Sequence, residues 1–134
     1  VGVVKVREKK TKKEVYKMLE VTKSTKHKIM MNLLYSLGIS AMELVKIKVN
    51  EIDFNQKVLR LKAKEVRLSD VMVEQIKQYL RGRPYQSEYL FASHEGHITQ
   101  TRVEKIVNTA CYGARVQAHS WGLEQRREVV GMEG

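Results

Sequence analysis

The side chains best suited to chemistry in this chain are cationic, and many of them could contact phosphate. Lysine and arginine account for 25 of the 134 residues against 15 aspartates and glutamates, so the formal net charge is +10. Such a domain gains affinity for polyanions, because each phosphate it neutralises releases condensed counterions. Lysines that only solvate an ordinary surface are the simpler alternative, since net charge alone discriminates weakly. The leading partner class is therefore nucleic acid, and the candidate contacts are Lys23, Lys26, Lys28, Lys62, Lys64 and Arg102.

Nucleophiles, acid–base groups and metal ligands are less evident than cations. Tyr35 and Tyr79 fall on apolar faces of predicted helices and Tyr89 lies in an apolar segment, so we expect all three to pack. Residues 94–97, His-Glu-Gly-His, lack the spacing that places two histidines one helical turn apart, so we predict no metal site. No glycine-rich phosphate loop or dinucleotide motif occurs, and we expect no cofactor. The remaining tyrosines, which have no base or cation cluster at suggestive spacing, are Tyr16, Tyr85 and Tyr112.

Three helices are predicted in the first third of the chain. Residues 11–14 fit a capping box that starts the first helix. Apolar residues at helical spacing predict a second helix from about residue 24 to residue 37, and Gly38 is expected to end it. Residues 40–43 fit a second capping box and predict a short third helix. The loop at Gly38 should therefore bring the second and third helices together.

The pattern then changes from a helical period to alternation. Residues 46–54 alternate, residues 58–61 continue the pattern after a polar interruption, and residues 66–68 supply a third short run. We predict a three-stranded antiparallel sheet, in which Lys62 and Lys64 lie in the turn between the second and third strands.

Two more helices complete the predicted fold. One is capped by Ser69 or Asp70 and ends near residues 81–84, and the last spans about residues 101–112. The fold class is therefore α+β, rich in helix, with one small antiparallel sheet. We interpret residues 1–10 as a basic lead-in or linker and residues 11–134 as one domain, a length sufficient for a real core.

The stretch 33–44, Leu-Leu-Tyr-Ser-Leu-Gly-Ile-Ser-Ala-Met-Glu-Leu, resembles the signature of the tyrosine recombinase (phage integrase) catalytic domain. That signature reads leucine-tyrosine-x-x-glycine-leucine-arginine-x-x-glutamate-leucine. Residues 51–53, 66–69 and 89–91 resemble, in the same order, the family's start of the sheet, its last strand and its tyrosine-leucine-phenylalanine segment. The resemblance covers roughly residues 11–119 and implies the recombinase catalytic fold.

The resemblance also implies which residues would cleave DNA. Members of the family use a tyrosine nucleophile, two arginines on the scissile phosphate, a lysine from the sheet turn and a histidine. Lys62 best matches the lysine, with Lys64 as second choice, and His119 matches the histidine. Ser40 and Gly122 occupy the two arginine positions, and we interpret Ser40 as a helix cap. The nucleophile would lie well beyond His119, and no matching tyrosine is present.

We therefore predict a C-terminally truncated, integrase-like DNA-binding domain that does not cleave or rejoin strands. One alternative is a fragment of an active site-specific recombinase whose nucleophile-bearing C-terminus is missing. Another is a non-enzymatic protein-interaction module on a recombinase-like core. The expected partner is duplex DNA, with self-association or association with a full-length recombinase as further options.

The place of action is predicted from what the sequence lacks. No apolar run is long enough to cross a membrane, so no membrane partner is expected. The single cysteine, Cys111, cannot form an internal disulfide. We expect an intracellular protein of the cytoplasm or nucleoid, or of a host cell if its origin is viral or a mobile element.

Overall fold

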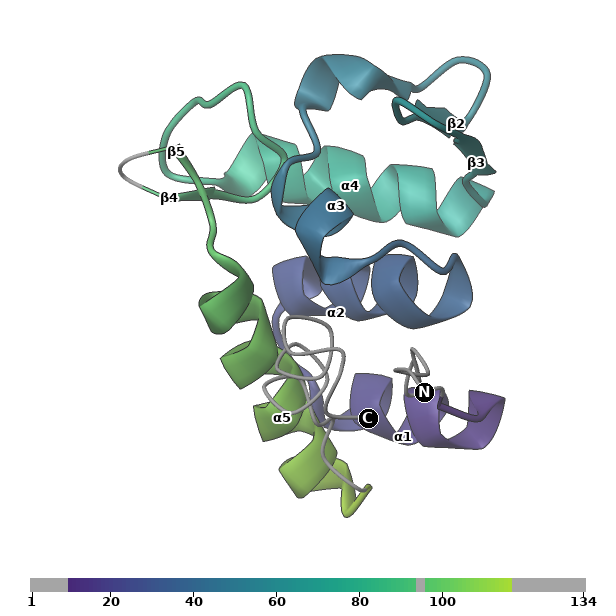
Figure 1. Cartoon of the computed structure of the whole chain (residues 1–134), viewed down its shortest axis with the longest axis vertical. Coiled ribbons are helices and arrows are strands. Elements are labelled where there is room, and N and C mark those ends of the chain that lie inside the picture. The colour runs from purple at the N-terminus through teal and green to yellow at the C-terminus, as the bar shows by residue number, and fades with distance from the viewer. Residues whose placement is uncertain (1–9, 94–95, 117–134) are drawn as a thin grey trace, which may run out of the picture.

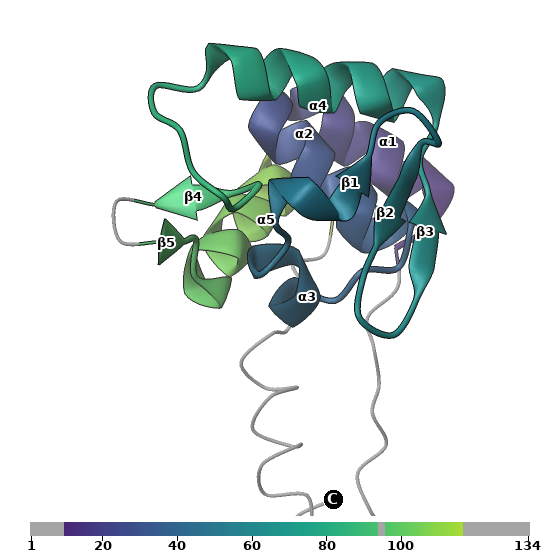
Figure 2. The ribbon, with the colours of Figure 1, turned by 90° about the horizontal axis from the view of Figure 1, so that it is seen from above.

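Helices supply most of the fold, and α5 packs against three of the others. The computed structural model describes residues 10–93 and 96–116 (Figure 1). Helix α5 packs against α1, α2 and α3, and α4 packs against α2 (Figures 1 and 2). No helix in these residues combines the length and the apolar character needed to span a membrane. The α-helices are α1 (Lys12–Val21), α2 (Thr25–Met31), α3 (Ala41–Val45), α4 (Asp70–Gly82) and α5 (Gln100–Ala114).

Side-chain caps start every α-helix at a position that the sequence makes readable. The Thr11 hydroxyl accepts the Glu14 N–H, and the Glu14 carboxylate accepts the Thr11 N–H, as predicted. Ser69 rather than Asp70 caps α4, because its hydroxyl accepts the Met72 N–H. Ser24 and Thr99 cap α2 and α5 in the same way. Each hydroxyl satisfies an N–H that would otherwise lack a partner in the first turn.

The predicted helix over residues 24–37 is present, but its last part is not α-helical. The α-helix ends at Met31, and residues Asn32–Ser36 continue it as a π-helical turn, η1. The Leu37 N–H bonds the Asn32 carbonyl, and the Ile39 N–H bonds the Leu33 carbonyl. This wider turn admits one extra residue while keeping Leu33 fully buried. Gly38 then ends the segment at φ +71°, a left-handed conformation that favours glycine.

The three-stranded antiparallel sheet is confirmed, but its first strand is shorter than the alternation predicted. The strands are β1 (Ile52–Asp53), β2 (Val58–Arg60) and β3 (Glu65–Arg67), in the order β1-β2-β3. Residues Val49–Glu51 form a 3₁₀ turn, η2, because the Glu51 carboxylate accepts the Lys48 N–H at 2.7 Å. Lys48 instead forms an isolated bridge with Tyr89.

A second, two-stranded sheet was not predicted. It pairs β4 (Ala92–Ser93) with β5 (Gly96–His97) and lies before α5 (Figure 2). The core beneath both sheets is formed by apolar side chains, and Met18, Met30, Leu44 and Phe91 are fully buried within it. No polar or charged residue of the described chain is buried. Charged side chains are therefore available at the surface that the core supports.

Candidate nucleic-acid interface

Ser40 is a helix cap. Its hydroxyl accepts the Glu43 N–H at 3.1 Å, and Glu43 Oε1 accepts the Ser40 N–H at 3.0 Å. These reciprocal bonds form the predicted capping box at the start of α3. The position therefore carries a neutral hydroxyl that is already engaged by the backbone, with no cationic donor.

Lys64 reaches this cap from the sheet. Its Nζ lies 3.3 Å from Glu43 Oε1 and donates to the Gly38 carbonyl at 3.4 Å. The turn that carries it is closed by the Leu61 N–H, which bonds the Lys64 carbonyl at 2.8 Å. Figure 2 shows this turn on the side of the molecule that carries α3. We call Gly38, Ser40, Glu43 and Lys64 the Ser40 corner.

Glu43 holds its charge in this corner. Partial burial would raise the pKa of its carboxyl, but the hydrogen bonds from Ser40 and Lys64 and the Lys64 charge outweigh burial. The pKa of Glu43 therefore lies below its ordinary value of 4.5. At neutral pH the corner contains one carboxylate for its one ammonium group.

Lys62, the first choice for the family lysine, belongs to the same turn. Its side chain is exposed, and no carboxylate of the described residues pairs with it. Of the two candidate lysines, Lys64 is the one that contacts Glu43 and the Gly38 carbonyl. The sequence could not separate them, because the turn lacks the glycines that would fix its register.

A second charged region lies between the start of α2 and one face of α5. It is a groove of about 510 Å³ that contains Lys23, His27, Arg102 and Lys105. No carboxylate is among the described residues that line it. We call it the α2–α5 groove. Its walls are residues 21–24 and His27 on one side, and Arg102, Lys105, Ile106, Thr109, Ala110 and Gly113 on the other.

Like charges interact across this region. Burial, and then the Arg102 charge, lower the pKa of Lys26. Burial, and then the charges of Lys26 and Arg102, lower the pKa of His27 below its ordinary value of 6.5. His27 is therefore mostly neutral at pH 7, while its lysine and arginine neighbours are charged. The groove has a positive field that no lining carboxylate offsets.

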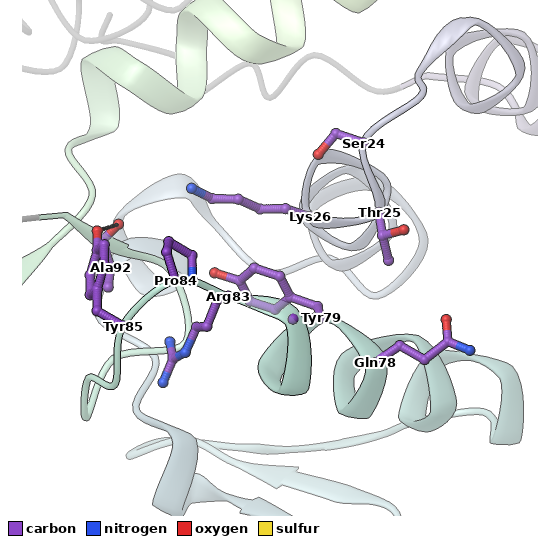
Figure 3. Close-up of a pocket in the computed structure, with 10 residues that line it drawn as sticks. Ser24, Thr25, Lys26, Gln78, Tyr79, Arg83, Pro84, Tyr85 and Ala92 are labelled. Atoms are coloured by element: carbon purple, nitrogen blue, oxygen red, sulfur yellow. Dashed lines mark hydrogen bonds between the residues drawn. The ribbon is translucent and has the colours of Figure 1, made fainter.

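Lys26 also faces a second hollow, of about 380 Å³, between α2 and the end of α4. Figure 3 shows its side chain extending from α2 across this hollow, above the Tyr79 ring. The Tyr79 hydroxyl donates to the Leu90 carbonyl at 2.8 Å, and its ring lies 5.9 Å from the Phe91 ring. Burial raises the pKa of Tyr79. Tyr79 therefore packs, as predicted, and is not an activated nucleophile.

The structure thus divides the predicted DNA contacts into separate groups. Lys23 and Arg102 meet in the α2–α5 groove, Lys26 lies beside it, and Lys62 and Lys64 belong to the sheet turn. Lys28, in the last turn of α2, lines neither the groove nor the second hollow. His119 and Gly122 lie outside the described residues.

Sequence reasoning missed two members of the groove, His27 and Lys105. Lys105 follows Arg102 by three residues, a spacing that places both on one helix face. His27 directly follows Lys26, but nothing in the sequence shows that α5 packs beside it. His97, from the other histidine motif, stacks edge-on against the Tyr89 ring at 5.1 Å. In the described part of the chain, no set of three His, Cys, Asp or Glu side chains is arranged to hold a metal.

Comparisons with known proteins agree with the fold. The model of the phage integrase family matches residues 2–128. The crystal structure of XerA recombinase is similar with a TM-score of 0.71 at 17% identity, over 83% of this chain and 44% of that one. The integrase from mycobacterium phage Brujita is similar with a TM-score of 0.70 at 21% identity, over 89% of this chain and 42% of that one. This chain thus spans less than half of either protein. A search of curated proteins finds no match.

Proposed function

Because this chain belongs to the phage integrase family, we propose that it is a DNA-binding domain related to site-specific tyrosine recombinases that does not cleave or rejoin DNA strands. The family resemblance alone does not separate two properties, of which we assign only the first to this chain. One is affinity for the DNA backbone, and the other is strand cleavage.

The observation that carries the proposal is the capping role of Ser40. Strand cleavage by a tyrosine needs cationic donors on the non-bridging oxygens of the phosphate and an acid for the leaving 5′-oxygen. Arginine suits the donor role because its planar fork bonds two oxygens and stays charged. The Ser40 hydroxyl has no charge and is bonded to the Glu43 N–H. By comparison with other preorganised donors, the absence of an arginine at this position lowers the cleavage rate on the order of a hundredfold or more.

Other positions support an inactive site. Lys64 is paired with Glu43 and the Gly38 carbonyl, so its ammonium group is held in the helix cap. Gly122, at the second arginine position, has no side chain to offer a phosphate. Lys62 and His119 remain the proposed matches to the family's lysine and histidine. Because both arginines are absent, we assign neither residue a role in cleavage.

DNA binding is supported by the net charge of +10 and by cations that no carboxylate neutralises in the α2–α5 groove. Contacts to backbone phosphate require charge and hydrogen-bond donors, and they do not require an active site. Lys23 and Arg102 are therefore the principal proposed contacts, together with Lys26, which lies beside the groove and interacts with the Arg102 charge. Lys28, Lys62 and Lys64 are secondary ones, because they neither line the groove nor lie beside it.

The binding part of the proposal is tested by fluorescence anisotropy of a labelled short duplex. We expect the affinity to fall steeply between about 50 and 200 mM salt, because bound phosphates release counterions. Absence of binding, or an affinity that does not change with salt, would contradict it. Size-exclusion chromatography of the same samples covers the alternative, since stable self-association without DNA retention would favour a protein-interaction module.

The cleavage part is tested with a nicked suicide substrate that traps a covalent protein–DNA adduct. The chain is used alone, and also joined to a tyrosine-bearing C-terminal segment from an active family member. We expect no adduct that survives denaturation in either case. A robust adduct with Ser40 unchanged would instead identify the chain as a fragment of an active recombinase.

A further inference from the structure

The α2–α5 groove places a histidine among lysine and arginine side chains. Lys23 comes from the connection between α1 and α2, His27 from α2, and Arg102 and Lys105 from the first two turns of α5. Ile106, which is buried, contributes apolar lining. The volume of the groove, about 510 Å³, is in the range of sites that bind ligands. A charged, partly apolar groove of this size can hold a phosphate group with part of its sugar.

The fold brings these cations together without supplying a counter-charge. Ser24 caps α2 and Thr99 caps α5, so His27 and Arg102 both lie in first turns. Helix α5 packs against α1 and α2 (Figure 1), and residues of both first turns line the groove. Like charges held this close repel, and an anion between them would remove that repulsion. The cationic groups thus form a complement to phosphate in the unbound protein.

We propose that the α2–α5 groove seats a backbone phosphate of duplex DNA, and that His27 donates a hydrogen bond to this phosphate as an imidazolium. This inference rests on the proposed DNA-binding function and names its principal site. Arg102 can contact two phosphate oxygens with its planar fork, whereas Lys23 and Lys105 act as point charges. His27 and Lys105 are thereby assigned as DNA-contact residues.

A consequence is that DNA binding takes up a proton. In the free protein, burial and the neighbouring charges of Lys26 and Arg102 keep the pKa of His27 below 6.5. A bound phosphate favours the charged ring and raises that pKa. The affinity for DNA therefore rises as pH falls through the pKa of the bound state, and it levels off below the pKa of the free state.

His27 is the only histidine among the described residues that line the groove, and no Asp or Glu lines it there. The charged groups that face His27 are Lys23, Arg102 and Lys105 in the groove and Lys26 beside it. Two hydroxyls in its walls are already donors, that of Thr22 to the Met18 carbonyl and that of Thr109 to the Lys105 carbonyl. The pH dependence near neutrality thus reports on His27.

The test measures duplex affinity by anisotropy at constant ionic strength from about pH 5.5 to 8.5, in the window where histidine titrates. The variants are H27Q, K105Q and R102Q, with K77Q as a control that removes one exposed lysine from α4. We expect K105Q and R102Q to weaken binding roughly three- to tenfold, since each phosphate contact that is lost removes its contribution from counterion release. K77Q should change it by less than about twofold.

His27 gives the more specific readout. Wild-type affinity should increase about three- to tenfold between pH 8 and pH 6, as a pKa rise of up to one unit requires. H27Q should lose most of that increase and keep the salt dependence. The pKa of the wild-type ring, followed by NMR with and without DNA, measures the same effect without any substitution and should rise on binding.

The possible outcomes distinguish a failure of the groove assignment from a failure of the proposed DNA-binding function. If wild type binds DNA but K105Q and R102Q match K77Q, and the His27 pKa does not move, the groove assignment is wrong while DNA binding stands. If wild type does not bind DNA, the proposed function itself fails. Inorganic phosphate distinguishes the source of the anion. If phosphate at low millimolar concentration moves the His27 pKa and duplex DNA does not, the groove is a small-anion site and the backbone assignment is overturned.

Discussion

The Ser40 corner and the α2–α5 groove differ in whether a carboxylate lies beside their cationic side chains. In the corner, the Lys64 ammonium is matched by the Glu43 carboxylate and by a backbone carbonyl. In the groove, Lys23, Arg102 and Lys105 have no lining carboxylate, and the pKa of neighbouring Lys26 falls as a result of burial and the Arg102 charge. The cation of the corner is neutralised by its neighbours, whereas no carboxylate among the described lining residues neutralises the cations of the groove.

This contrast explains how binding and cleavage can separate within one domain. Cleavage depends on donors preorganised at a single phosphate, and the Ser40 corner lacks the arginine that the family signature places there. Binding depends on many contacts along the backbone that need no such geometry. A surface can therefore keep its affinity for DNA after the catalytic donors are gone.

The largest predicted effect compares paired changes in the two regions. K23Q/R102Q removes two unpaired groove cations and should weaken duplex binding about ten- to a hundredfold at low salt. K62Q/K64Q removes the same charge from the sheet turn but should weaken binding only about threefold, because Lys64 is already paired. Anisotropy titrations at matched salt measure both. Equal losses would contradict the distinction between the regions.

A smaller effect is expected from S40A, which tests the capping role directly. Loss of the hydroxyl leaves the Glu43 N–H without its partner and should lower the free energy of unfolding by about 1 kcal/mol. Chemical denaturation provides the measurement. DNA affinity at neutral pH should remain that of wild type, and a large fall in affinity with unchanged stability would make Ser40 a DNA contact.

E43Q tests whether the Glu43 carboxylate restrains the Lys64 ammonium group. The amide oxygen can still accept the Ser40 N–H, so the stability loss should stay below about 1 kcal/mol. Lys64 loses its carboxylate partner, and duplex affinity should rise about two- to threefold. The double variant E43Q/K64Q is the control, because it should not show this gain. A gain that persists without Lys64 would show that the pair does not restrain the ammonium group.

The smallest effect is the pH dependence of stability from His27. Its pKa is lowered in the folded state, so the unfolded chain binds a proton near pH 6.5 before the folded protein does. The free energy of unfolding should therefore decrease as pH falls below about 6.5. Thermal melts from pH 8 to 5.5 should show a smaller decrease for H27Q than for wild type. Glu43 contributes only at lower pH, because its pKa is below 4.5.

Local signals predicted much of the scaffold. The caps at Thr11 and Ser40 and the three-stranded sheet follow from short-range patterns that the structure keeps. The alternation over residues 46–54 predicted too long a first strand. Residues 49–51 instead form a turn that is stabilised by the hydrogen bond from the Lys48 N–H to the Glu51 carboxylate. The second sheet was missed because its strands are two residues each, too short for any period.

The candidate site was less predictable than the scaffold. Ser40 as a cap could be anticipated from four consecutive residues. The choice of Lys64 over Lys62 depends on which side of a glycine-free turn faces α3, and the grouping of His27 with Lys105 depends on how α5 packs on α2. Such contacts between distant segments leave no periodic signal along the chain.

The most direct test of the central claim, binding without cleavage, is a single gel experiment with the nicked suicide substrate. Native electrophoresis should show a salt-sensitive complex of the chain with DNA, and denaturing electrophoresis of the same samples should show no covalent adduct, for wild type and for S40R alike. A complex that yields a covalent adduct on denaturation would contradict the account, whether it formed with wild type or after the single change of Ser40 to arginine.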